Sequence, residues 1–372
     1  MAAALVTGAD GFLGRNLCLA LERCAEAEVL RFDVQHEPSA LDPLVARADF
    51  IFHLAGVNRP QNEDEFVTGN VDLTERLCSL AAGHGRTVPI LLSSSTQAAL
   101  DNPYGRSKRA AEKVVWDYQR RTGAAAVVYR FPNLFGKWSR PNYNSVVSTF
   151  CHCIACGEPI DVHAPEREVT LAYVDDVVAV CLDAWQRRAT LPHSDKPCEL
   201  QETYTLTLGQ LAALLQGFHA ARTGAPLPDF SQPLIRKLYA TFLSYYDADQ
   251  LATAPTLHTD QRGWLFELVK SPFFGQIFVS STAPGVTRGQ HAHDTKTEKF
   301  CVVQGTGTIR LRHLATNEQV AYAVSGDHIR IVDIPPGYAH SIENTGDIEM
   351  ITLFWASEVF DPEKPDTHYE EV

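Results

Sequence analysis

The chain has 372 residues, of which 45% are hydrophobic, and this size and composition suit two globular domains. Its 32 Lys and Arg residues against 45 Asp and Glu residues give a net charge of −13, which argues against nucleic acid or an anionic membrane as the main partner. No apolar run reaches the roughly 18 residues of a membrane-spanning helix. The start lacks a basic leader, and the nine cysteines suggest reduced thiols, so we expect a cytoplasmic protein.

The first half of the chain alternates short apolar runs with helical patterns, which predicts a parallel sheet wound with helices on both faces. We expect strands at 3–7, 29–32, 50–55, 89–94 and 125–130. We expect helices at 14–26, 71–84, 107–122 and 207–221. Ligands of such a sheet bind at the carboxyl ends of its strands. Three cysteines, Cys151, Cys153 and Cys156, do not have the spacing of a zinc site and are expected to be ordinary thiols.

The pattern changes after a polar stretch at 247–255, which we take as the boundary between domains 1–248 and 256–372. Short β-type segments then recur between Gly, Asp and Asn turns, at 275–281, 298–303, 307–313, 320–324, 328–334 and 348–355. Such a series predicts an antiparallel barrel or jelly roll. The expected fold is therefore a Rossmann-type α/β domain followed by an all-β domain.

Three glycines follow the first strand and open the first helix. Gly8 permits the tight turn, Gly11 lets the backbone approach a pyrophosphate, and Gly14 lets the helix pack closely on the strand. Asp33 ends the second strand, where a carboxylate accepts the ribose hydroxyls of NAD and repels the 2′-phosphate of NADP. The alternative is a solvated turn carboxylate, and Arg31 nearby complicates the preference.

Tyr104 and Lys108 are four residues apart and so share a helix face. An ammonium group near a phenol lowers its pKa, which makes Tyr104 a usable proton donor. A serine from the end of the preceding strand would hydrogen-bond the substrate carbonyl. We favour Ser95 for this role, with Ser94 as the alternative.

These residues resemble the extended short-chain dehydrogenase/reductase family, whose members act on sugars carried by UDP, dTDP or GDP. Further similar segments are His53-Leu-Ala-Gly56, Asn70-Val71, Arg130-x2-Asn133-x-Phe135-Gly136 and Tyr173-Val-Asp-Asp176. The resemblance implies that the cofactor is bound by Gly8, Asp10, Gly11, Phe12, Leu13, Gly14, Asp33, Leu54, Ala55, Gly56, Asn70, Tyr104 and Lys108. It implies that the sugar substrate is bound by Ser94, Asn133 and Arg167.

The second half carries a set of metal-binding residue types. His291 and His293 flank one residue on an expected strand and so point to the same side, and Glu298 and His340 complete three nitrogens and one carboxylate. That set suits zinc and, less selectively, iron, nickel or manganese. The segments Gly285-x5-His291-x-His293-x4-Glu298-x6-Gly305 and Pro335-x-Gly337-x2-His340-x3-Asn344 resemble the two cupin motifs. One departure is Ile329, which stands where a glycine is usual, and Gly326 is the alternative for that position. A cupin barrel without metal is the alternative.

A metal there would act as a Lewis acid on a sugar ketone, which acidifies the neighbouring C–H bond and permits epimerisation. The base stays open among His293, Lys296, Glu298 and Tyr338.

The order of the two halves resembles the family of the capsular polysaccharide assembling protein CapF. The matching segments are Leu54-Ala-Gly-Val-Asn-Arg-Pro60, Asp101-Asn-Pro-Tyr-Gly105, Pro132-Asn-Leu-Phe-Gly-Lys-Trp138, Pro141-Asn-Tyr-Asn-Ser145 and Phe360-Asp-Pro-x-Lys-Pro-Asp366. The resemblance implies a homodimeric zinc enzyme on the route to UDP-N-acetyl-L-fucosamine. Its cupin would epimerise carbon 3 of a UDP-2-acetamido-2,6-dideoxy-4-hexulose, and its reductase would then reduce the 4-keto group with NADPH to a UDP-N-acetyl-6-deoxy-L-talosamine.

The carboxylate of Asp33 is not what an NADPH-specific enzyme would be expected to have at this position. We therefore hypothesise that the enzyme accepts both cofactors or prefers NADH. The sequence allows two other functions. One is a single-activity UDP-4-keto-sugar reductase whose cupin only binds a ligand or makes a dimer. The other is a non-catalytic nucleotide sensor, against which the presence of Ser95, Tyr104 and Lys108 speaks.

Overall fold

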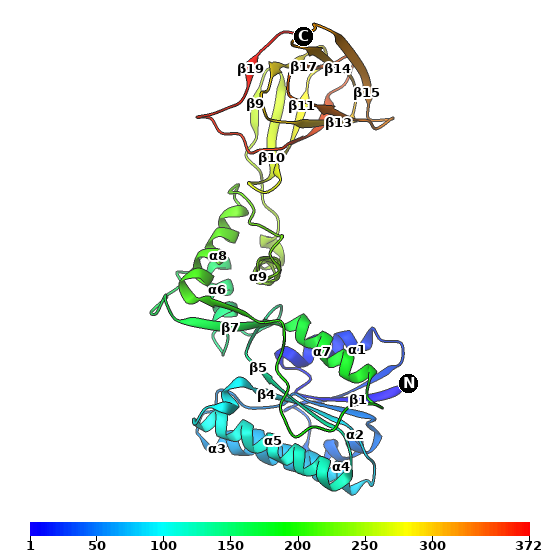
Figure 1. Cartoon of the computed structure of the whole chain (residues 1–372), viewed down its shortest axis with the longest axis vertical. Coiled ribbons are helices and arrows are strands. Elements are labelled where there is room, and N and C mark those ends of the chain that lie inside the picture. Colours follow the sequence, from blue (N-terminus) through cyan, green and yellow to red (C-terminus); the bar gives the residue numbers. More distant parts are fainter. The chain divides into compact units, whose positions relative to one another are not determined.

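The computed structural model describes residues 1–372 and separates into two compact units. The first comprises residues 1–215 and 236–246, and the second comprises 216–235 and 247–372 (Figure 1). Residues 216–235 thus group with the C-terminal unit, whereas the sequence reading kept them in the first domain. No helix has the length and apolar character required to span a membrane.

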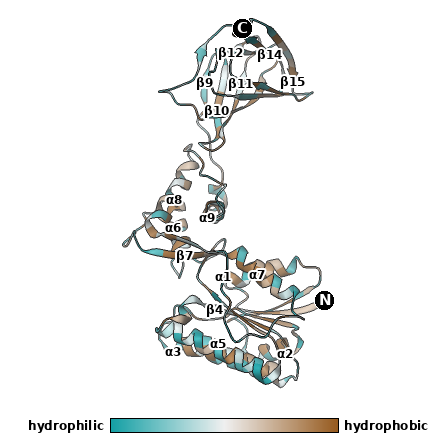
Figure 2. Ribbon diagram, viewed as in Figure 1, coloured by the Kyte–Doolittle hydropathy of each residue, from teal (hydrophilic) through white to brown (hydrophobic).

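The first unit is built on a five-stranded parallel sheet with the strand order β2-β1-β3-β4-β5. Its strands are β1 (Ala2–Thr7), β2 (Ala27–Phe32), β3 (Phe50–His53), β4 (Ile90–Ser95) and β5 (Ala126–Phe131). The residues of β1 and β3 are almost all buried. The sheet is mostly hydrophobic in colour in Figure 2. All five correspond to strands expected from the sequence, although β3 ends at His53 and not at residue 55.

Helices cover both faces of this sheet, because neighbouring residues of each strand point into two separate cores. Leu5 lies in the core formed with α2 (Leu41–Arg47), α4 (Leu73–Gly83) and α5 (Pro103–Thr122). Val6 lies in the core formed with α1 (Phe12–Glu22) and α7 (Val174–Gln186). The expected doubly wound α/β fold is confirmed.

The start of α5 differs from the sequence prediction in a way that matters for the site. The helix begins at Pro103 and not at residue 107, because the Asn102 side chain accepts a hydrogen bond from the Gly105 N–H at 2.7 Å and proline suits a first helical position. It ends at Gly123, whose φ is +74°. Tyr104 therefore lies inside the first turn of the helix that carries Lys108.

Smaller elements complete the helical part of the chain. A second sheet has the order β6-β7-β8, with β6 (Asn133–Phe135), β7 (Glu168–Tyr173) and β8 (Tyr204–Thr207). The remaining helices are α3 (Asp64–Phe66), α6 (Val146–Ala155), α8 (Leu208–Ala221) and α9 (Pro233–Leu243). Short 3-10 or π turns are η1 (Pro38–Ala40), η2 (Val67–Asp72), η3 (Thr96–Ala99) and η4 (Ala248–Gln250). All nine cysteines are free thiols, including Cys151 and Cys153 in α6.

The C-terminal unit contains two antiparallel sheets, with the orders β16-β13-β18-β11-β10-β9 and β15-β14-β17-β12-β19. Their inner faces meet in one core that includes Phe300, Ile309, Ile342 and Phe354. This architecture confirms the expected all-β domain. The strands are β9 (His258–Asp260), β10 (Gly263–Ser271), β11 (Gly275–Thr282), β12 (Thr287–Ala292), β13 (Glu298–Gln304), β14 (Thr306–His313), β15 (Gln319–Ser325), β16 (Ile331–Ile334), β17 (Tyr338–Asn344), β18 (Met350–Ala356) and β19 (His368–Tyr369).

Candidate functional site

The glycine-rich turn joins β1 to α1 at the carboxyl edge of the parallel sheet. Gly8 has a φ of +70°, and a Cβ on it would lie 2.7 Å from the Ala55 nitrogen after β3. A Cβ on Gly14 would lie 2.0 Å from the Gly8 oxygen, so the helix packs on the turn only without a side chain. Gly11 caps α1 without a side-chain hydrogen bond. The first-turn N–H groups of Phe12 and Leu13 are thus directed to the space before the helix, which suits a pyrophosphate.

Asp33 lies beside this turn, directly after β2. Its Oδ2 accepts a hydrogen bond from the Asp10 N–H at 2.7 Å, and its Oδ1 accepts one from the Val34 N–H at 2.7 Å. Each oxygen keeps a second lone pair for a ribose hydroxyl. Arg31 is paired with Glu22 at 2.5 Å, and no ion pair joins it to Asp33.

A serine, a tyrosine and a lysine come together where β4 meets α5. Ser95 ends β4, and its hydroxyl accepts the Gln97 N–H at 3.2 Å. Burial raises the pKa of Tyr104, and the nearby Ser95 hydroxyl opposes that rise. The sequence argument that Lys108 lowers this pKa is wrong for the structure as it stands, because the Lys108 Nζ donates to the Ser93 carbonyl at 3.0 Å.

Lys108 itself is buried beside the turn that follows β3. Burial lowers its pKa to about 8, and Glu112 opposes that change. A Cβ on Gly56 would lie 2.7 Å from the Asn70 Oδ1 and 3.0 Å from the Lys108 Nζ, so only glycine fits between them. Asn70 is fixed by bonds to the Val57 N–H and C=O, each at 2.9 Å. The backbone at Leu54, Ala55 and Gly56 therefore borders the lysine.

Sequence reasoning missed Glu112, which lies under this centre with none of its surface exposed. Its carboxylate binds the Arg130 guanidinium through two hydrogen bonds of 2.9 and 2.7 Å. The Ser94 hydroxyl donates to the same carboxylate. Ser94 is thus committed to a buried ion pair, whereas Ser95 faces Tyr104. The i, i+4, i+8 spacing of Tyr104, Lys108 and Glu112 was the available sequence signal.

The remaining two residues assigned to substrate binding lie at the small sheet. Asn133 begins β6, is exposed, and donates from Nδ2 to the Thr170 carbonyl at 3.3 Å. Arg167 immediately precedes β7 and is also exposed. No contact joins either residue to Tyr104 or Ser95, so their role stays a prediction.

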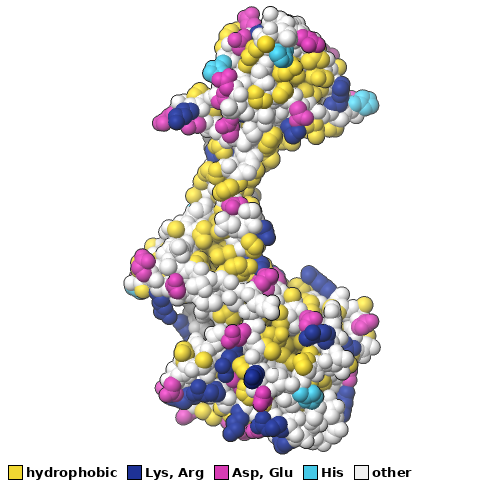
Figure 3. Space-filling model, in the orientation of Figure 1, with side chains coloured by type: hydrophobic (Ala, Val, Ile, Leu, Met, Phe, Trp, Pro, Cys, Tyr) yellow, Lys and Arg dark blue, Asp and Glu magenta, His cyan; other side chains and the backbone are white.

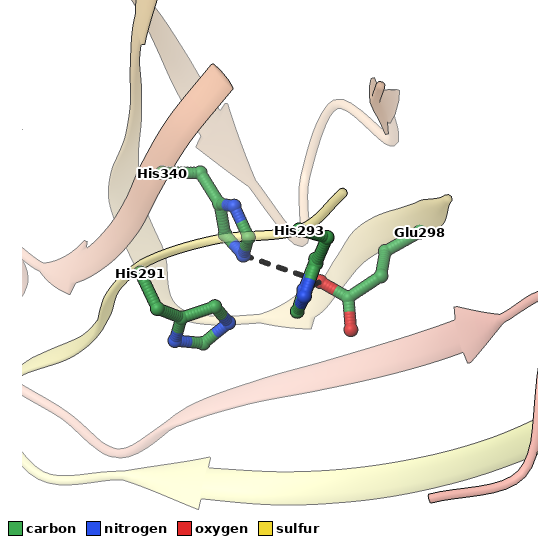
Figure 4. Close-up of side chains that lie close together, drawn as sticks. All are labelled: His291, His293, Glu298 and His340. Atoms are coloured by element: carbon green, nitrogen blue, oxygen red, sulfur yellow. Dashed lines mark ion pairs between the residues drawn. The ribbon is translucent and has the colours of Figure 1, made fainter. Parts of the chain in front are cut away.

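In the C-terminal unit, four side chains far apart in sequence converge inside the barrel (Figure 4). Their ligand atoms all lie within 4.8 Å of one another. His291 and His340 are brought opposite each other by the pairing of β12 with β17. His293 follows β12, and Glu298 begins β13 in the other sheet.

Two side chains of this cluster, His291 and Glu298, are held in the protonation states that favour metal binding. The Glu298 Oε2 lies 3.3 Å from the His293 Nε2 and 3.2 Å from the His340 Nε2, yet none of these three buried atoms has a hydrogen-bond partner. Burial and the neighbouring imidazoles lower the pKa of His291 to about 4. Burial raises the pKa of Glu298, but His293 and His340 outweigh it and lower the value to about 2. Neutral imidazole and ionised carboxylate are the forms that bind zinc.

Two other side chains considered as proton acceptors lie near this cluster. The Lys296 Nζ donates to the Pro365 carbonyl at 3.4 Å and to the Thr367 hydroxyl at 3.3 Å, so the C-terminal segment holds it. Tyr338 packs edge-on against His313, with ring centroids 4.8 Å apart. The assignment of the base therefore stays open.

Each half of the chain matches a known protein family. Residues 4–196 match the NAD dependent epimerase/dehydratase family, and residues 258–368 match the polysaccharide biosynthesis C-terminal domain. The fold and the first site thus define an NAD-dependent epimerase/dehydratase joined to an all-β domain. The chain is 41% identical over 364 residues to a UDP-2-acetamido-2,6-beta-L-arabino-hexul-4-ose reductase of Pseudomonas aeruginosa, covering 98% of this chain and 97% of that protein.

Solved structures give the same result along the whole chain. The crystal structure of the capsular polysaccharide assembling protein CapF from Staphylococcus aureus is 41% identical, with a TM-score of 0.91 and coverage of 99% of this chain and 100% of that one. A structure of CapF with the inhibitor 3-isopropenyl-tropolone is 37% identical, with a TM-score of 0.87 and full coverage of both chains, 100% each. The chain belongs to the CapF family.

Proposed function

We propose that this chain is a bifunctional enzyme that acts twice on one UDP-linked ketosugar. The cupin of residues 256–372 epimerises carbon 3 of a UDP-2-acetamido-2,6-dideoxy-4-hexulose. The reductase of residues 1–248 then reduces the 4-keto group with NADPH. The product is a UDP-N-acetyl-6-deoxy-L-talosamine on the way to UDP-N-acetyl-L-fucosamine for capsule or O-antigen polysaccharide.

The observation that carries this proposal is the presence of both sites in one chain. The chain also shares 41% identity over 98% of its length with a relative named for the reduction of a UDP-hexul-4-ose. The two reactions need the same group, because a 4-keto oxygen acidifies the neighbouring C–H bond. Reduction of that ketone then fixes the new stereocentre.

In the reductase, Tyr104 holds the proton that is delivered to the carbonyl oxygen. Its raised pKa keeps the phenol protonated at neutral pH, so it is a donor before the reaction starts. Ser95 lies near Tyr104, where its hydroxyl opposes the rise of the tyrosine pKa, and it is the serine that we assign to the substrate carbonyl. Lys108, with a pKa of about 8, is mostly cationic at pH 7 and provides positive charge next to the cofactor turn. The nicotinamide cofactor supplies the hydride when bound.

In the cupin, His291, His293, Glu298 and His340 would hold a zinc ion. The donor set of three nitrogens and one carboxylate supports zinc, and so do the four buried atoms without a partner, His293 Nε2, His340 Nδ1, His340 Nε2 and Glu298 Oε2. When bound, the metal supplies Lewis acidity to the ketone oxygen. The three imidazoles and the carboxylate would fix the position of that ion inside the barrel.

For the cofactor, we propose that NADPH is used and that NADH is also accepted. Asp33 supports the second part, because its carboxylate lies beside the glycine turn and Arg31 is paired elsewhere. The ratio of kcat/KM for NADPH and NADH tests this proposal. A preference for NADPH above about 100-fold, or roughly 2.7 kcal/mol, would contradict it.

A second candidate is a single-activity reductase with a cupin that binds a ligand or makes a dimer. The name of the Pseudomonas aeruginosa relative, which states reduction alone, favours it. The two candidates predict different results in D2O without reduced cofactor. Only the bifunctional enzyme would incorporate solvent deuterium at carbon 3. Full-length Tyr104→Phe is the variant of choice, because it blocks reduction and leaves the cupin intact.

We also propose that the chain forms a homodimer through its C-terminal unit. One row across the six-stranded sheet pairs Ile331 with Cys301, Leu353 and Val279, and all four are apolar residues of the outer face. Ile331 is 65% exposed and Leu353 is 36% exposed. Hydrophobic side chains also gather on the visible face of this unit (Figure 3). Ile331→Asp is expected to give monomers in analytical ultracentrifugation.

A further inference from the structure

The last residues of the chain pair with β12, the strand that carries His291 and directly precedes His293. β19 pairs with β12, so that Tyr369 lies opposite His291. The Glu370 N–H donates to the Gln290 carbonyl at 3.0 Å, and the Glu370 carboxylate pairs with Arg312 at 2.9 Å. We name residues 357–372 the C-terminal strap. β12 therefore lies between β17, which carries His340, and this strap.

Asp366 is the residue through which the strap holds the turn between His293 and Glu298. Its Oδ1 accepts a hydrogen bond from the Asp294 N–H at 2.9 Å. Its Oδ2 accepts the Thr295 N–H at 3.1 Å and the Lys296 N–H at 2.9 Å. One carboxylate thus satisfies three successive backbone donors in the loop that joins two metal-binding side chains.

The backbone of the same residue contacts His293 directly. The His293 Nδ1 lies 2.5 Å from the Asp366 carbonyl oxygen. A carbonyl only accepts, so Nδ1 must carry the proton and Nε2 must carry the lone pair. That Nε2 is the buried, unpartnered atom that faces Glu298. By contrast, the Nδ1 of His340 has no partner, so this control of the tautomer is specific to His293.

The strap adopts an unfavourable backbone conformation to make these contacts. Asp366 has a φ of +33°, a region that residues other than glycine rarely occupy and that persists only where surrounding contacts enforce it. Lys296 supplies such contacts on both sides, because its Nζ donates to the Pro365 carbonyl and the Thr367 hydroxyl. The conformation of residue 366 is therefore fixed from the barrel.

We infer that Asp366 is a positioning residue of the metal site, which fixes the tautomer and orientation of His293 from the C-terminal strap. This inference rests on the proposed metal site. Hydrogen-bonded partners of metal-binding imidazoles raise metal affinity and determine which ring nitrogen binds. Asp366 achieves this indirectly, because its carboxylate anchors the loop and thereby places its own carbonyl against Nδ1.

The test is metal affinity of the full-length protein, measured by competition with a chromogenic chelator for Zn²⁺ and by the absorption spectrum of Co²⁺. Asp366→Ala is expected to weaken zinc binding about 10–100-fold and to change the visible Co²⁺ bands. Glu363→Ala is the matched control, because it removes an exposed strap carboxylate that has no contact with the loop. It should bind as the wild type does.

Asp366→Asn is the second variant, to be measured if Asp366→Ala does not fold. Asparagine tolerates a positive φ, but its neutral amide replaces the carboxylate that anchors the loop, so zinc affinity should fall by about threefold or more. Wild-type affinity and an unchanged Co²⁺ spectrum in the folded variants would overturn the role of Asp366 while leaving the metal site in place. A wild-type protein that binds neither ion would overturn the metal site and this inference together.

Discussion

Glu112, which is buried, and Arg130, which is partly buried, form a two-point ion pair with hydrogen bonds of 2.9 and 2.7 Å. Glu112 lies on α5 and Arg130 on β5, and Ser94 of β4 donates to the same carboxylate. The pair therefore ties the helix that carries Tyr104 and Lys108 to two strands of the sheet. We therefore expect the Glu112–Arg130 ion pair to help fix the positions of Tyr104 and Lys108.

Removal of Glu112 should destabilise the protein strongly. Glu112→Ala leaves the Arg130 guanidinium, whose side chain is 21% exposed, without its counter-charge, and we expect the free energy of unfolding to fall by about 3–5 kcal/mol. Chemical denaturation monitored by circular dichroism measures this loss. Asp101→Ala, which breaks an exposed pair with Arg106, is the control and should change little. A loss below about 1 kcal/mol for Glu112→Ala would contradict the role of this pair.

The two neighbouring serines should have different effects when replaced. Ser95→Ala removes the hydroxyl that contacts Tyr104, so hydride transfer should fall about 10²-fold or more while the stability is unchanged. Ser94→Ala should instead lower the stability by about 1–3 kcal/mol, because it takes a donor from buried Glu112. Single-turnover oxidation of NADPH and thermal unfolding separate the two effects. If Ser94→Ala abolished hydride transfer and Ser95→Ala lowered only the stability, Ser94 would be the serine that binds the substrate carbonyl.

Replacement of the tyrosine hydroxyl should remove reduction and spare binding. Tyr104→Phe is expected to lower the rate of hydride transfer by about 10²–10⁴-fold, because no other proton donor is placed at that position. Cofactor binding, followed by fluorescence quenching, should be unchanged within about twofold, since the glycine turn is untouched. A Tyr104→Phe protein with full activity would refute the assignment of this residue.

The reductase should lose activity in mildly alkaline solution. Burial lowers the pKa of Lys108 to about 8, so the ammonium is present below that pH and is lost as the pH rises through it. We expect kcat/KM for the cofactor to fall above pH about 8. The Lys108→Met variant should have a low kcat/KM at every pH, whereas kcat/KM of the Lys108→Arg variant should no longer fall above pH about 8. A wild-type profile that stays flat to pH 10 would exclude a role for the lysine charge.

Metal removal should affect only one of the two activities. Chelation, or His340→Ala, should abolish exchange at carbon 3 and leave the reduction of an already epimerised ketosugar intact. The control is His328→Ala, because His328 is exposed and lies outside the cluster. Metal content by mass spectrometry and proton NMR of the sugar give the two readouts. Exchange that survives full chelation would contradict a metal-dependent cupin.

Local patterns were sufficient to predict most of the fold and the groups of residues at each site. The glycine turn depends on Gly8, Gly11 and Gly14, which lie within one turn and one helix start, so their spacing alone indicates their positions. Alternating β segments likewise predict an antiparallel domain without tertiary information. The two-residue spacing of His291 and His293 on an expected strand already implied that they point to the same side.

The features that the sequence did not predict mostly depend on contacts between residues far apart in the chain. Asp366 lies 73 residues from His293, and its importance comes from a carbonyl that any residue possesses. The direction of the pKa change in Tyr104 depends on burial and on where the Lys108 Nζ points, which are tertiary properties. The early start of α5 depends on the Asn102 cap and on Pro103 at the first helical position, which the sequence analysis did not use.

Exchange of carbon-bound hydrogen tests the bifunctional assignment most directly. The full-length, zinc-loaded Tyr104→Phe protein would be incubated in D2O with the UDP-2-acetamido-2,6-dideoxy-4-hexulose and no reduced cofactor. We predict that deuterium appears at carbon 3 and that the wild type with NADPH then yields the reduced sugar with inverted carbon 3. Reduction by the wild type without any deuterium or inversion at carbon 3 would contradict the account and leave a reductase with a non-catalytic barrel.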